Sequence, residues 1–343
     1  MTGHIIATTS LLAAFVAATA LAQTPADQQA SSKATAAKSE ATSNEKGKKW
    51  RTAWGDPDLQ GTWTNATTTP LQRPAKYMGR EFLTPEERAA QDKDTEIATD
   101  KRHQVGTPQD VEDAYNGAWW DRGRSDGRTS MIYDPPDGRI PPLTPEAQKR
   151  IAALPRLDAS LEGEPGTGTY AGPESVDLYP RCIIRAPLPR VPTGYDNNYQ
   201  MVQGPGFVAI MQEQIHETRI IPTDGRPHLN SGVRQWLGDS RGHWEGETLV
   251  VETTNFSDAA TFQEATTNMK LVERWTRTAD DHVDYRFTVS DPETWTKPWS
   301  ASIPWNKTGP LFEYACHEDN YGLYGILAGA RAKEKQAAVK AAK

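Results

Sequence analysis

The chain has 343 residues, a formal net charge of −7 at pH 7, 36% hydrophobic residues and 11 Trp. An acidic chain is a poor nucleic-acid binder, because such binding depends on neutralising phosphates. No run of about 20 apolar residues, the length a membrane-spanning helix needs, follows the N-terminus. The tryptophans require a large buried core. We therefore expect a globular protein whose partner is a small molecule and not a nucleic acid.

The N-terminus resembles an export signal. Residues 9–22 form a short apolar stretch that ends in Ala20-Leu21-Ala22, the small-residue pattern of a signal-peptide cleavage site. The Ala-, Gln-, Ser- and Lys-rich residues that follow lack any aromatic side chain up to Lys49 and cannot form a core. We predict a signal peptide at 1–22, a disordered spacer at 23–49, one β-rich domain at 50–330 and a basic tail at 331–343. The expected location is the periplasm or the outside of the cell, with no stable membrane span once the signal is removed.

Two helices are predicted in the first half of the domain, residues 50–194. Thr84-Pro85 and Thr144-Pro145 each combine an N-cap threonine with proline at the first helical position, followed by glutamate. These signals predict helices at about 84–97 and 144–154, between long loops rich in proline and glycine. At the other end, the Ala/Lys-rich residues 328–343 predict a solvated helix or a frayed tail.

From Tyr195 onward the pattern changes to short strands in which apolar and polar residues alternate. After a first strand near 62–65, the predicted strands are 199–203, 206–213, 217–222, 247–255, 270–277, 282–289 and 299–303. Tight turns predict hairpins that pair Trp244 with Leu249 and Trp275 with Tyr285. The expected fold class is mainly β, an antiparallel up-and-down barrel of the lipocalin-like kind or a sandwich, with strands in 195–327. Short connections favour the barrel.

Cys182 and Cys316 are the only cysteines. In an exported protein they favour a disulfide. The alternative is a thiolate nucleophile or a metal ligand, because His317 and Glu318 follow Cys316 directly.

Most of the candidate site residues lie in two polar stretches, around 215–246 and 313–321. Their mixture of His, acids, Arg and Trp suits an oxygen-rich substrate, with His and a carboxylate for proton transfer. We expect His216 or His317 as the base, oriented by Glu217 or Glu318, with Asp239 as a further catalytic candidate. The candidate substrate-binding residues are Tyr199, Arg181, Arg219, Arg226, His228, Arg234, Trp236 and Asn320.

Cofactors are not expected. A divalent metal held by His216, His228 and His317 is an alternative, but no His-x-His or His-Glu-x-x-His spacing supports it. The sequence also lacks Gly-x-Ser-x-Gly, Walker and dinucleotide-binding fingerprints.

Three segments carry a resemblance. Residues 219–228 (RIIPTDGRPH), 236–256 (WLGDSRGHWEGETLVVETTNF) and 314–321 (YACHEDNY) resemble signatures of a family of exported bacterial proteins. The resemblance extends from about Trp54 to Arg331 and implies export and a β-rich fold. It transfers no catalytic role to any residue.

Three functions remain open from the sequence. The first is a periplasmic catabolic hydrolase or lyase that uses acid/base chemistry on a small oxygen-rich or glycosidic compound at the barrel mouth. The second is a lipocalin-like binding protein whose cavity is lined by Trp236, Trp244, Trp275 and Trp295. The third is an envelope scaffold. Convergence of His, Glu and Arg would favour the enzyme, and an apolar interior would favour the binder.

Overall fold

The computed structural model describes residues 50–99, 121–153, 170–318 and 320–342. The described part belongs to the compact unit Lys49–Lys343. The signal peptide and spacer predicted for 1–22 and 23–49 lie outside the described residues.

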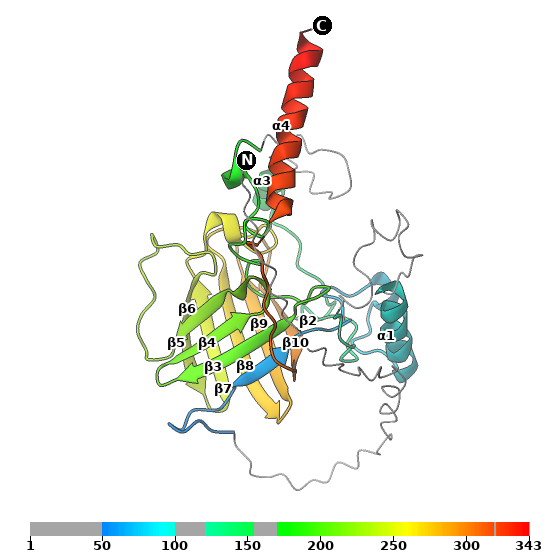
Figure 1. Cartoon of the computed structure of the whole chain (residues 1–343). Helices are drawn as coiled ribbons and strands as arrows, with labels where there is room; N and C mark the ends of the chain where they lie inside the picture. The colour runs from blue at the N-terminus through cyan, green and yellow to red at the C-terminus, as the bar shows by residue number, and fades with distance from the viewer. Residues whose placement is uncertain (1–49, 100–120, 154–169, 319, 343) are drawn as a thin grey trace, which may run out of the picture. The chain divides into compact units, whose positions relative to one another are not determined.

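The fold is mainly β, a ten-stranded antiparallel sheet that is nearly closed into a barrel (Figure 1). The strand order is β5-β4-β3-β1-β10-β9-β8-β7-β6, and β2 pairs with β10 beside this path. The strands are β1 (Gly61–Thr64), β2 (Ile132–Asp134), β3 (Asn198–Gly204), β4 (Phe207–Gln212), β5 (Thr218–Pro222), β6 (Asp239–Glu245), β7 (Thr248–Thr254), β8 (Lys270–Ala279), β9 (His282–Ser290) and β10 (Trp299–Lys307). The expectation of an antiparallel barrel is confirmed, and so are both hairpins.

Large aromatic side chains fill the barrel because alternate residues of each strand point inward. Trp275 of β8 stacks on Tyr285 of β9, with ring centroids 4.8 Å apart. Tyr199 of β3 stacks on Trp305 of β10 at 4.5 Å. All four side chains are buried. The core of the molecule is therefore the barrel interior, and the tryptophan-rich sequence from 275 onward supplies much of it.

The barrel has a seam between β5 and β6. Nine strands form the path and every neighbouring pair is antiparallel, so the two end strands run in the same direction, and no backbone ladder joins them among the described residues. They are still close at one point. A Cβ at Gly242 would lie 3.0 Å from side-chain carbons of Ile221 and Thr223, so the glycine permits this approach.

The predicted helices are present and are capped as expected. The α-helices are α1 (Pro85–Thr99), α3 (Pro145–Ala153) and α4 (Tyr321–Ala341), and short 3₁₀ turns occur at η1 (Ala75–Tyr77), η2 (Pro173–Ser175), η3 (Gln214–His216) and η4 (Asp258–Ala260). Thr84 and Glu87 form a reciprocal capping box at α1. Thr144 accepts a bond from the backbone N–H of Ala147 at α3. Among the described helices, none combines the length and the apolar character needed to cross a bilayer.

The structure differs from the expected elements in four places. Strand β6, predicted only through its hairpin end, begins at Asp239, and the short β2 was not predicted. Helix α4 begins at Tyr321, seven residues before the expected start at 328, because Asn320 caps it through its side chain. The η3 turn, where Ile215 and His216 have φ of 69° and 55°, interrupts the alternation that the sequence suggests between β4 and β5.

Candidate functional site

Arg219 bridges the barrel seam with its side chain. It extends inward from β5, and its Nε donates to Ser240 Oγ of β6 at 2.9 Å. Its Nη2 donates to Thr253 Oγ1 of β7 at 2.7 Å and to Glu273 Oε2 of β8 at 2.5 Å. The second oxygen of the same carboxylate, Glu273 Oε1, accepts a hydrogen bond from the hydroxyl group of Tyr285 of β9 at 2.8 Å. These buried bonds link β5 to β6, between which the backbone ladder is missing, and continue to β7, β8 and β9.

A second buried ion pair lies beside the first. Arg190 pairs with Glu217, and both side chains are about nine-tenths buried. Burial lowers the pKa of Arg190 to about 10, which leaves the guanidinium charged at neutral pH. Glu217 also accepts a bond from the backbone N–H of Arg185 at 3.3 Å. Each of the two arginines thus has its own carboxylate, and the polar interior is neutral overall.

These groups surround an inner cavity of about 30 Å³. It is lined by Leu188, Arg190, Tyr199, Ile210, Gln212, Glu217, Arg219, Leu237, Glu273, Trp275, Tyr285 and Trp305. Burial raises the pKa of Tyr199 to about 12, and it raises that of Tyr285 as well, with the Glu273 carboxylate adding to the effect. Both phenols therefore remain protonated and neutral at physiological pH.

A larger cleft of about 490 Å³ adjoins the cavity on the outside of the seam. It is lined by Ile184, Thr218, Arg219, Ile220, Arg234, Gln235, Trp236, Leu237, Gly238, Ser240 and Ser257. The cleft combines the exposed apolar side chains of Ile220 and Trp236 with hydroxyl and amide groups. Arg219 and Leu237 line both spaces, so they stand between the cleft and the cavity.

His228, on the loop that precedes β6, pairs with Asp239, the first residue of that strand. The imidazole Nδ1 lies 2.8 Å from Asp239 Oδ2, which also accepts the backbone N–H of Leu229 at 2.9 Å. Arg241 donates to the other carboxylate oxygen at 2.6 Å. Burial alone would raise the pKa of Asp239, but these three donors outweigh it and hold that pKa below its usual range. The imidazole Nε2 lies 3.7 Å from Glu252 Oε1 of β7.

The structure does not bring together His216 and Glu217 as an acid/base pair. His216 is exposed, and its Nε2 accepts a bond from the backbone N–H of Tyr314 at 2.8 Å. Glu217 lines the inner cavity and is paired with Arg190. His317 and Glu318 are both exposed at the surface.

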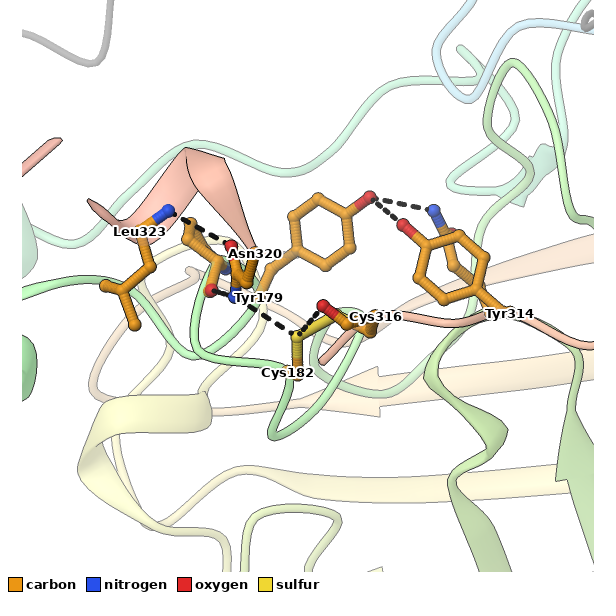
Figure 2. The surroundings of a disulfide bond; sticks show 8 residues. Tyr179, Cys182, Tyr314, Cys316, Asn320 and Leu323 are labelled. Carbon is orange, nitrogen blue, oxygen red and sulfur yellow. Dashed lines mark hydrogen bonds between the residues drawn. A yellow bond between two sulfur atoms is a disulfide. The ribbon is translucent and has the colours of Figure 1, made fainter. Parts of the chain in front are cut away.

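The cysteines form a disulfide, as expected, and Figure 2 shows its surroundings. The alternative of a free thiolate at Cys182 or Cys316 is wrong, because the two sulfurs are bonded to each other. Asn320 donates to the carbonyl of Pro180 at 2.8 Å and accepts from the backbone of Leu323, which connects α4 to the loop of Cys182. Asn320 therefore has a structural position beside the disulfide.

The remaining predicted residues fall outside the inner cavity. Arg226 pairs with Asp224 on an exposed turn. Arg234 donates to the carbonyls of Phe256 and Thr267 at the rim of the outer cleft. Arg181 is half-buried next to the disulfide. Within the described ranges, no three His, Cys, Asp or Glu side chains are grouped so that they could hold a metal ion.

Several cavity residues were missed as site candidates. Arg190, Glu273 and Tyr285 were not named, and Trp305 was not expected in the cavity, although Trp275 was. Glu273 does have a sequence signal. It lies between Leu271 and Trp275 on the inward side of a strand, and a charge in that phase indicates a buried partner. The tryptophans divide differently from the expectation: Trp236 lines the cleft and Trp275 the cavity, whereas Trp295 is buried in the core and Trp244 packs against it.

Comparisons of the chain with models of protein families, with curated proteins and with solved structures find no match.

Proposed function

We propose that this protein binds a small, neutral, oxygen-rich molecule of sugar-like chemistry in the cleft at the barrel seam. The observation that carries the proposal is the cleft itself, with about 490 Å³ of space and a lining that includes both Trp236 and hydroxyl and amide side chains. An indole presents a flat apolar face that suits the C–H face of a sugar ring. Thr218, Gln235 and Ser257 offer hydrogen bonds to its hydroxyl groups.

Charge in the inner cavity supports a neutral ligand group there, whereas in the outer cleft the charged lining residues are Arg219 and Arg234. Arg219, which lines both spaces, is already paired with Glu273, and Arg190 with Glu217. A carboxylate or phosphate brought to the cavity would meet two carboxylates as well as two guanidinium groups. The interior therefore gives an anion no net attraction.

The proposed location is the periplasm or the outside of the cell. The disulfide between Cys182 and Cys316 supports it, because disulfides persist in oxidising compartments.

The binding test compares two tryptophans of similar exposure. Trp236 is 41% exposed and lines the cleft, whereas Trp54 is 39% exposed and its indole donates to Asp56. Titration calorimetry with neutral methyl glycosides should give a Kd that rises about tenfold or more in Trp236→Ala, because removal of a packed aromatic contact costs on the order of 1.4 kcal/mol or more. Trp54→Ala should leave the Kd within about twofold. Equal losses in the two variants, or no binding to the wild-type protein, would contradict the proposal.

A second candidate function, hydrolase or lyase, is favoured by the pair of His228 and Asp239. The buried carboxylate of Asp239 fixes the imidazole through Nδ1, so Nε2 is the nitrogen that could exchange a proton with a ligand, beside the carboxylate of Glu252 at 3.7 Å, and the His228 side chain is 27% exposed. If the protein cleaves a bound glycoside, His228→Gln should slow turnover by about 100-fold or more while the Kd stays unchanged. Product release from a chromogenic aryl glycoside measures this.

His243→Gln is the matched control, because His243 also contacts a carboxylate, that of Glu245, but is exposed. Equal turnover in the wild type and in His228→Gln would exclude His228 as the base.

A further inference from the structure

Apart from the paired atoms of Arg190 and Glu217, three buried polar atoms of cavity-lining residues have no hydrogen-bond partner in the described part of the chain. They are the indole Nε1 atoms of Trp275 and Trp305 and the amide Oε1 of Gln212. Their residues are 1%, 2% and 6% exposed, and all three line the cavity. A buried polar atom without a partner has lost its hydrogen bonds to water and gained none, so such atoms are uncommon unless something binds them.

The chemistry of these atoms selects the group that binds them. An indole N–H only donates, and an amide oxygen only accepts. A partner for all three must accept two hydrogen bonds and donate one. A hydroxyl group does this with its two lone pairs and one proton. A carboxylate or a ketone has no proton for Gln212, and an ammonium group has no lone pair for the indoles.

We propose that the inner cavity is the subsite for a single hydroxyl group of the ligand, carried on a hydroxymethyl arm that enters past Leu237. This inference rests on the proposed function and specifies the ligand class, a sugar or polyol with a primary alcohol. Trp275 and Trp305 donate to the hydroxyl oxygen, and Gln212 accepts its proton.

The size of the cavity fits this assignment. About 30 Å³ holds a group of roughly the size of one water molecule, which is too small for a sugar ring. The ring remains in the outer cleft, whose volume is about 490 Å³. Leu237 and Arg219 line both spaces and mark the passage between them. Arg219 is held by hydrogen bonds to Ser240, Thr253 and Glu273, so the arm would pass beside the apolar Leu237.

The test uses two probes that differ by one oxygen, methyl α-D-glucopyranoside and its 6-deoxy counterpart. Calorimetry on the wild-type protein should show that the glucoside binds at least about tenfold more tightly, because the deoxy probe leaves the three polar atoms without a partner. In Gln212→Leu this preference should fall to about threefold or less. Gln200→Leu, on the exposed side of β3, should keep the full preference. Thermal unfolding of each variant checks that it is folded.

The outcomes distinguish failure of the hydroxyl subsite from failure of sugar binding in the cleft. If the two probes bind the wild-type protein equally well and Trp236→Ala weakens both, the cleft binds sugars and the hydroxyl subsite is overturned, with water as the occupant of the cavity. If neither probe binds, the proposed function fails for this ligand class and the subsite fails with it. A tenfold preference that Gln212→Leu leaves unchanged would also overturn the assignment of Gln212.

Discussion

Arg219 and Glu273 are buried side chains of opposite charge, and their pairing determines what the barrel interior can hold. The guanidinium contacts β6, β7 and β8, and the carboxylate also accepts the hydroxyl of Tyr285. Because both charges are removed from water, each depends on the other for its stability. The pair neutralises the polar interior and, at the same time, connects strands across the seam.

Removal of one partner should destabilise the protein strongly. Arg219→Met leaves Glu273 buried without its cation, and the expected loss is about 3–5 kcal/mol of the free energy of unfolding. The double variant Arg219→Met/Glu273→Gln removes both charges and should recover a large part of that loss. Urea denaturation followed by fluorescence measures both. If the double variant loses as much free energy of unfolding as Arg219→Met and Glu273→Gln lose in total when measured singly, the two charges do not stabilise each other.

At the residue scale, the sequence predicted some cavity residues and concealed others. Tyr199, Glu217 and Arg219 were site candidates, and all three line the inner cavity. Arg190 could not be predicted, since it comes from a loop whose position depends on tertiary packing. His216 and Glu217 are neighbours in the sequence, but the η3 turn directs them to different partners, Tyr314 and Arg190.

Helices and strands whose formation depends on neighbouring residues could be predicted from the sequence. The Thr-Pro-Glu starts of α1 and α3 satisfy backbone N–H groups within one turn, and alternation predicts β8 and β9 because one face of each is buried. Strand β6 lacks that alternation. Asp239 lies on the outer face of the strand but is buried, because the loop of His228 covers it. The three-residue β2 exists only through its pairing with β10, a non-local contact.

The open seam is also a property of elements and not of single residues. An odd number of strands in an antiparallel path makes the first and last strands run in the same direction, so a hairpin cannot join them. Gly242 lets β6 approach β5 at Ile221, and Arg219 bridges toward Ser240. The cleft lies at this bridged part of the seam, and Thr218 of β5 and Ser240 of β6 are among its lining residues. The cleft thus lies where the strand count leaves the sheet without a hairpin connection.

At the scale of the whole molecule, the disulfide connects the C-terminal segment to the loops before the barrel strands. Cys182 and Cys316 are 134 positions apart, and most of the barrel lies between them. Near the bond, Tyr179 and Tyr314 share a hydrogen bond of 2.9 Å between their hydroxyls (Figure 2). Tyr314 also donates its backbone N–H to His216, which places the C-terminal segment on the η3 turn.

The double variant Cys182→Ser/Cys316→Ser should lower the free energy of unfolding by about 2–5 kcal/mol. The reason is that the disulfide closes a long loop and so restricts the unfolded chain. Urea denaturation of the oxidised wild type, the reduced wild type and the double variant measures the effect, and the last two should agree.

Limited proteolysis distinguishes unfolding of the whole domain from release of the C-terminal segment alone. Helix α4 has no buried residue, and Asn320, its N-cap, bonds to the carbonyl of Pro180 beside Cys182. Without the disulfide, the segment that precedes α4 should be cleaved first under native conditions, while the barrel remains resistant because its core does not depend on that segment. Simultaneous cleavage of the barrel and the C-terminal segment would contradict this, since it would mean that the disulfide supports the barrel itself.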